Sequence, residues 1–130
     1  MHIKKFLEWI GLKEKLHSKL QKIPHVSEGQ IWWASLGENI GFEINGKSKL
    51  FTRPVLIFKK LSKEFFLVVP LTTQHHMGSW YVNYTHAGKS ITACLQQVRT
   101  IDYRRFYSKL GVLDDSDFEK IKIGFRTLYH

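Results

Sequence analysis

Beyond Pro24 the chain contains a series of short apolar runs, each bounded by glycine or by polar residues. The runs that have the length of a β-strand are Ile31–Leu36, Pro54–Phe58, Phe65–Val69, Ser79–Tyr84 and Ser90–Leu95. Such runs, separated by polar turns, are typical of antiparallel strands. Shorter strands are predicted at Val98–Ile101 and Lys109–Leu113, on either side of a helical turn at Tyr103–Tyr107. The pattern therefore predicts a mainly β fold.

The C-terminal segment has the pattern of an amphipathic helix. Ser116 and Glu119 have the spacing of a capping box, and the aspartates around Ser116 favour a helix N-terminus. The apolar face predicted for this helix comprises Phe118, Ile121, Phe125 and Leu128. Several short strands followed by one closing helix predict a small antiparallel barrel or half-barrel.

Residues 1–27 have a helical pattern, which ends at Pro24. Their apolar residues fall on two stripes, rotated from each other, on either side of Gly11. The stripes comprise Trp9, Leu12, Leu16, Leu20 and Ile23, and Ile3, Phe6, Leu7 and Ile10. We therefore expect a kinked or two-piece helical extension that packs on its own domain or on a partner, with a basic membrane-surface helix as the alternative. Residues 28–130 form the predicted barrel domain.

The charge balance indicates the kind of partner. Of the 130 residues, 20 are lysine or arginine and 11 are aspartate or glutamate, which gives a net charge of +9. This excess favours a polyanion or an acidic protein as the partner. No apolar run approaches the roughly 20 residues that cross a bilayer, and Cys94 is the only cysteine. We expect a cytoplasmic protein that uses no metal, cofactor or membrane.

Short blocks of sequence occur in the order and spacing found in one family of toxins. The blocks are Glu28–Trp33, Gly41–Glu43, Arg53–Ile57, Val69–Gln74 and Gln97–Asp102. Over residues 28–130 the chain therefore resembles the PemK/MazF toxins of type II toxin-antitoxin systems. The resemblance implies an SH3-like antiparallel barrel with a C-terminal helix, assembled as a homodimer. It also implies an endoribonuclease that cleaves single-stranded mRNA without a metal and is silenced by a cognate acidic antitoxin.

Two residues match the active-site positions of the family. Arg53 matches the arginine that precedes a proline, and Thr72 matches the catalytic threonine. Cleaving RNA without a metal requires a 2′-hydroxyl to attack the adjacent phosphate, with proton transfer and stabilisation of the developing charge. A guanidinium binds phosphate through two parallel hydrogen bonds, and a hydroxyl donates one. The resemblance therefore implies Arg53 and Thr72 as the catalytic residues.

Other residues in or near these blocks are expected to bind RNA or to support the site. They are Glu43, Thr73, His75, Gln97 and Arg99. We interpret Arg99 as a phosphate or structural contact, Gln97 as buried support and Glu43 as a loop anchor. His75 follows Thr72 closely, and because histidine exchanges protons near neutral pH it is a candidate for proton transfer. The long loop over residues 37–52 is expected to contact the antitoxin.

The sequence departs from one branch of the family. That branch places a histidine, an arginine and an aspartate where this chain has Phe42, Cys94 and Gln96. The mechanism of that branch is therefore not carried over to this chain, and no carboxylate base is expected at Gln96.

Two further hypotheses remain open at this point. One is a non-enzymatic poison that binds a protein such as DNA gyrase, as the related CcdB toxins do. The other is a decayed relative that binds only RNA or an antitoxin. Because one fold hosts several functions, the residues of the site have to discriminate between them.

Overall fold

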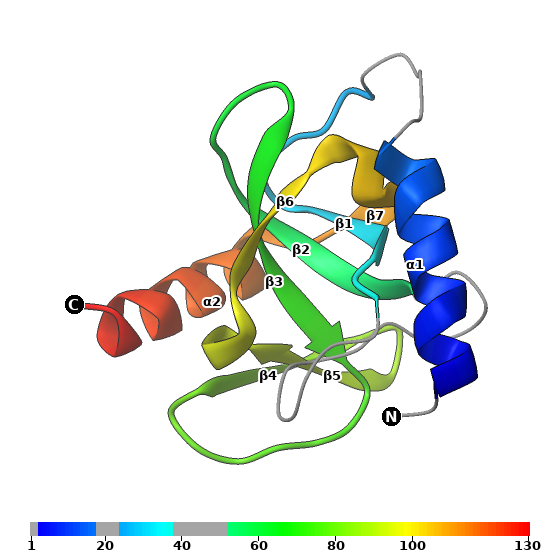
Figure 1. The fold of residues 1–130 in the computed structure, drawn as a ribbon. Helices are drawn as coiled ribbons and strands as arrows, with labels where there is room; N and C mark the ends of the chain where they lie inside the picture. Colours follow the sequence, from blue (N-terminus) through cyan, green and yellow to red (C-terminus); the bar gives the residue numbers. More distant parts are fainter. Residues whose placement is uncertain (1–2, 18–23, 38–51) are drawn as a thin grey trace.

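A computed structural model describes residues 3–17, 24–37 and 52–130 of the protein (Figure 1). The strands are β1 (Gln30–Ser35), β2 (Thr52–Lys60), β3 (Phe65–Thr72), β4 (Tyr81–His86), β5 (Lys89–Cys94), β6 (Arg99–Asp102) and β7 (Phe106–Val112). The α-helices are α1 (Ile3–His17) and α2 (Asp115–Leu128), and the 3₁₀ helices are η1 (Leu95–Gln97) and η2 (Tyr103–Arg105). Phe42 and Glu43 lie outside the described residues.

The strands form one antiparallel sheet in the order β4-β5-β3-β2-β1-β7, with β6 paired to β3. β3 is central because its first half lies between β2 and β6, whereas its last residues pair with β5. Among the described strands, β4 and β7 are the two ends of this order, so the sheet is an incompletely closed barrel. The predicted fold class, a mainly β SH3-like barrel with a C-terminal helix, is confirmed.

β4 and β5 are joined by a two-residue turn. Ala87 and Gly88 both have positive φ values, of 49° and 78°. Two consecutive left-handed residues are the geometry that connects tightly paired antiparallel strands, and glycine accommodates it without strain. The turn places His86 opposite Lys89 at the tip of the hairpin.

The hydrophobic core consists of two clusters. The first packs β1, β2, β3, β6 and β7 together and includes Trp32, Phe66 and Phe106. The second lies under α2 and is built around Leu56, Val69 and the fully buried Ile121 of that helix. Phe118, Phe125 and Leu128 pack against this second cluster, which confirms the apolar face predicted for the C-terminal helix. Figure 1 shows α1 and α2 on different sides of the sheet.

The boundaries of two elements differ from the prediction. The C-terminal helix begins at Asp115 with Asp114 as its N-cap, so Ser116 lies inside the helix and does not cap it. The backbone N–H of Leu113 donates to the carbonyl of Gly29 at 2.8 Å, which fixes the chain just before the helix. The helical turn predicted through Tyr107 ends at Arg105, because the following residues pair with β1 as part of β7.

The N-terminal helix also differs in part. α1 runs through Gly11 without interruption, so the two-piece alternative is wrong. A single glycine costs a helix only about 1 kcal/mol, which the flanking helix formers offset. Trp9 of the first predicted stripe is buried, whereas Leu7 and Ile10 of the second stripe are exposed. Residues 18–23 of the predicted stripes lie outside the described chain.

Candidate functional site

A cavity of about 740 Å³ opens at the start of β2 and the end of β3. Its polar lining includes Arg53, Thr72, Thr73, His86 and Lys89. Its apolar walls include Ile31, Trp33, Tyr84, Ile91, Tyr107, Leu110 and Val112. We call it the Arg53 cavity. Apolar walls with a few convergent polar groups are the usual composition of a ligand site.

Arg53 and Thr72 come together because β2 and β3 are antiparallel neighbours. Val55 of β2 pairs with Pro70 of β3, and two residues further along both strands are Arg53 and Thr72. Both side chains line the cavity. The structure thus places the two residues that we predict to be catalytic at one point of the sheet.

Arg53 is buried, with only 9% of its surface exposed, whereas charged side chains are mostly exposed in folded proteins. Its Nη1 donates a hydrogen bond to the carbonyl oxygen of Leu71 at 3.4 Å. Burial lowers the pKa of the guanidinium from its ordinary value, and the neighbouring Cys94 opposes that change. Burial likewise raises the pKa of the Cys94 thiol, and Arg53 opposes it. The charge of Arg53 is therefore held in a partly dehydrated place, where it interacts more strongly with an anion than it would in water.

Thr72 is the last residue of β3 and is half-buried. The backbone N–H of Gln74 donates to its Oγ1 at 3.2 Å. Because a hydroxyl can accept and donate at the same time, this contact orients the oxygen and leaves its own proton to donate. Thr72 is thus positioned to give a hydrogen bond to an anionic oxygen in the cavity.

The supporting residues predicted from the sequence are distributed over several places. Thr73 lines the cavity next to Thr72. His75 is exposed in the following loop, with its Nε2 3.2 Å from the Sδ of Met77. Gln97 lies in η1 and Arg99 in β6, and the described lining of the cavity includes neither. Glu43 lies outside the described residues, so its role as a loop anchor stays a prediction.

The remaining departures from the family pattern lie near the same end of the sheet. Cys94 is the buried last residue of β5, opposite Tyr81. Gln96 lies in η1, and its side-chain oxygen is buried without a hydrogen bond from the described residues. Cys94 and Gln96, the two described positions interpreted as departures from one branch of the family, thus carry a thiol and an uncharged amide.

Sequence reasoning did not identify the part of the cavity lining that comes from the β4–β5 hairpin and from β7. Lys89 and His86 reach it from the tip of the β4–β5 hairpin, and Tyr107 reaches it from β7. Tyr84 is buried with its hydroxyl unpartnered among the described residues, and burial raises its pKa to about 12, with Asp117 adding to the effect. The turn at His86–Lys89 was recognisable, but its position depends on the β3–β5 pairing, which no local signal specifies.

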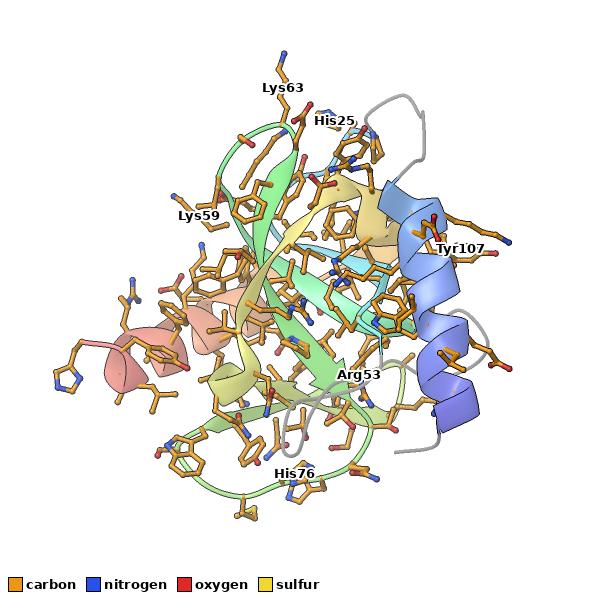
Figure 2. All side chains as sticks on the ribbon, viewed as in Figure 1. His25, Arg53, Lys59, Lys63, His76 and Tyr107 are labelled. Carbon is orange, nitrogen blue, oxygen red and sulfur yellow. The ribbon has the colours of Figure 1, made fainter. Side chains whose placement is uncertain are left out.

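Figure 2 shows Arg53 and His76 toward one end of the molecule, and Lys59 and Lys63 at the other. The described residues contain no group of three or more histidine, cysteine, aspartate or glutamate side chains that would hold a metal ion. None of the described helices is both long and apolar enough to cross a membrane.

Comparison with known protein families identifies one match. The family described as PemK-like, MazF-like toxin of type II toxin-antitoxin system matches residues 27–129. A search of curated proteins finds no significant match.

Solved structures with a similar fold include two from bacterial toxins. MazF from Deinococcus radiodurans (form I) is 18% identical, with a TM-score of 0.65 over 83% of this chain and 97% of that chain. An endoribonuclease in complex with its cognate antitoxin, from a mycobacterial species, is 17% identical, with a TM-score of 0.63 over 79% of this chain and 93% of that chain. At these identities the similarity shows the fold.

Proposed function

Because the chain belongs to the PemK-like, MazF-like family of type II toxin-antitoxin toxins, we propose that it is an endoribonuclease that cleaves single-stranded mRNA without a metal. The observation that carries the proposal is the pairing of a buried arginine with an oriented threonine hydroxyl at the mouth of one cavity. The family's members include endoribonucleases. A protein-binding poison would not need this pair of phosphate-binding groups.

The substrate proposed for the cavity is a single-stranded polyanion. The net charge of +9 favours RNA at the surface, and Lys89 adds a cation to the lining of the cavity that Arg53 and Thr72 share. Trp33, Tyr84 and Tyr107 supply aromatic surface to the walls, and unpaired bases stack on such surfaces. We therefore expect RNA binding to weaken steeply as the salt concentration rises.

In the proposed reaction a ribose O2′ forms a bond to the adjacent phosphorus, and the bond from that phosphorus to the next O5′ breaks. The 2′-hydroxyl loses a proton and the O5′ gains one, which leaves a 2′,3′-cyclic phosphate and a 5′-hydroxyl. Arg53 places positive charge beside the non-bridging oxygens, and Thr72 donates a hydrogen bond to one of them. Both contacts strengthen as negative charge accumulates on the phosphorane.

A homodimer and an acidic antitoxin are the proposed partners, both in the cytoplasm. β7 lies at one end of the described strand order, and its exposed side chains Tyr107, Leu110 and Val112 also line the Arg53 cavity, so a second copy that packs on this strand would border the site proposed for RNA. The mycobacterial relative was solved with its cognate antitoxin. An acidic antitoxin segment would compete with RNA for the Arg53 cavity. Light scattering at micromolar concentration should report a dimer, and a monomer would contradict this assembly.

The proposed function is tested by incubating the protein with a long unstructured RNA in EDTA. We expect fragments that carry a 2′,3′-cyclic phosphate, or its hydrolysis product, and a 5′-hydroxyl. The matched variant Thr72→Ala should cleave about tenfold more slowly, which would show that the activity comes from this chain. Intact RNA, or cleavage that appears only when Mg²⁺ is added, would contradict the proposal.

A further inference from the structure

Trp9 is the most deeply buried of the described side chains of α1. Trp9 is only 6% exposed, although Leu7 and Ile10 of the same helix are exposed. Its indole lies directly on Gly37, and a Cβ added at that position would clash with the ring. Gly37 has a φ of +85°, so glycine satisfies both the backbone conformation and the close approach of the ring. The segment after β1 is therefore shaped to receive Trp9.

Arg105 extends this contact to β1. Its guanidinium carbon lies 5.6 Å from the centre of the Trp9 ring, which is the geometry of a cation–π interaction. Its Nη1 donates to the carbonyl oxygen of Ser35 at 3.1 Å. Burial lowers the pKa of this guanidinium, and the nearby Arg99 adds to the effect. Arg105 is thus a half-buried cation, and it holds the end of β1 from the side of η2.

The end of β1 is paired with the start of β2. Ser35 pairs with Thr52, and Ala34 pairs with Arg53. These are the outermost described pairs of the β1–β2 ladder, so no further described pair supports them on that side. Figure 1 shows α1 along the side of the sheet where β1 ends and β2 begins. A contact that fixes Ser35 therefore also restrains the backbone of Arg53.

We propose that Trp9 and Arg105 are positioning residues, which clamp the end of β1 and keep Arg53 aimed into its cavity. This inference rests on the proposed function and extends it to an element outside the residues that match the family, since α1 ends before residue 27. Displacement of a catalytic group by about 1 Å can cost about 100-fold in rate. Loosening of the outermost pairs therefore lowers the rate of the chemical step more than it weakens RNA binding.

The test compares the full-length wild-type chain with Trp9→Ala, Trp9→Phe and the control Ile10→Ala, all well below their melting temperatures. For Trp9→Ala we expect kcat for RNA cleavage to fall about tenfold while KM stays within about twofold. Trp9→Phe keeps a flat aromatic ring at this position, so its kcat should stay close to that of the wild type. Ile10→Ala, on the exposed side of the same helix, should match the wild type.

A second measurement separates positioning from general stability. Native-state hydrogen exchange in Trp9→Ala should become faster at amides of residues 34–35 and 52–54, while β4 and β5 keep their wild-type protection. Arg105→Lys keeps the positive charge but loses the planar fork, so it should give the same local pattern, and it replaces Trp9→Ala if that variant fails to fold.

Two outcomes would overturn the inference. One is exchange that accelerates uniformly over the whole sheet, which would mean that α1 adds only global stability. The other is a Trp9→Ala enzyme with wild-type kcat. If the wild-type chain cleaves no RNA, the proposed function fails, and the exchange pattern still decides whether Trp9 and Arg105 clamp β1.

Discussion

The two α-helices have similar lengths, 15 residues in α1 and 14 in α2, yet they attach to the sheet in different ways. α2 packs a continuous apolar face against the second core cluster, with Ile121 fully buried. Its backbone approaches so closely at Gly124 that an added Cβ would lie 2.8 Å from a methyl group of Val82. α1 docks through Trp9 and a neighbouring cation, and leaves Ile10 46% exposed.

The difference separates what holds the fold together from what holds the site in place. α2 contributes buried area to the core, so the sheet depends on it for stability. α1 contributes no described residue to either core cluster, but its Trp9 contacts Gly37 and Arg105, and Arg105 holds Ser35 at the end of β1. Substitutions in α2 should therefore change mainly the free energy of unfolding. Substitutions at the docked face of α1 should change mainly the rate of RNA cleavage.

The largest expected effect on stability comes from truncating a buried isoleucine of α2. Ile121→Ala should lower the free energy of unfolding by about 2–5 kcal/mol, because it leaves a cavity in the second core cluster. The matched change Ile10→Ala on α1 should alter it by less than about 0.5 kcal/mol. Urea denaturation of both variants measures the contrast, and equal losses would show that the two helices are not attached differently.

Removal of residues 1–23 should have a smaller effect on stability. The loss of the buried Trp9 should lower the free energy of unfolding by about 1–3 kcal/mol and leave the sheet folded. The deletion stops before Val26 because that residue is fully buried in the first core cluster. Cleavage should be slower but measurable. A truncated chain that folds and cleaves no RNA would make α1 part of the active site.

Replacing each of the two glycines of the described α-helices by alanine should change the stability of the protein in opposite directions. Gly11→Ala in α1 should stabilise the protein by up to about 1 kcal/mol, because nothing lies within 4 Å of the added Cβ and alanine favours the helix. Gly124→Ala in α2 should destabilise it, because overpacking against Val82 and Leu95 outweighs that gain. Thermal melting of both variants tests the pair, and a shift in the same direction would contradict the difference in packing.

The smallest expected effect concerns the ion pair of Asp102 and Arg104 beside α1, with a closest distance of 2.8 Å. Burial alone would raise the pKa of Asp102, but hydrogen bonds from Arg104 outweigh it and lower that pKa below its ordinary value. A carboxyl whose pKa is lowered in the folded state stabilises the protein above its unfolded pKa of about 3.9, and this contribution disappears as the pH falls through the folded value.

Asp102→Asn should therefore melt at a slightly lower temperature than the wild type at pH 7, and at the same temperature once Asp102 is protonated at strongly acidic pH. Asparagine keeps a side-chain oxygen for the N–H of Arg104, so the comparison isolates the charge. Melting curves over this pH range measure the difference. A difference that persists unchanged in acid would mean that the carboxylate charge does not act here.

Much of the fold was predictable from the sequence because the strands are encoded locally. The runs beginning at Ile31, Pro54 and Phe65 are apolar enough to be recognised, and the positions of the strands follow them closely. The boundaries were predicted less well where tertiary contacts decide them. Phe106 joins a strand because it pairs with Ala34, and Ser116 does not cap α2 because the contact between Leu113 and Gly29 fixes the start of the helix.

The candidate site was predictable in its residues but not in its surroundings. Arg53 and Thr72 could be identified by resemblance, and the antiparallel pairing of their strands brings them together. The burial of Arg53 was not predictable, because the groups beside it, the carbonyl of Leu71 and the thiol of Cys94, come from other strands. The docking of Trp9 on Gly37 joins two segments with unrelated local patterns, so no periodicity could indicate it.

The most direct test of the central claim, that the Arg53 cavity is where RNA is cleaved, is the single-turnover cleavage rate of Arg53→Ala in EDTA. We predict a rate at least about 100-fold below that of the wild type, because the variant lacks the cation that stabilises the transition state. Arg126→Ala, which removes an arginine from the exposed face of α2, is the matched control and should cleave at the wild-type rate. An Arg53→Ala protein that remains folded and cleaves as fast as the wild type would contradict the account.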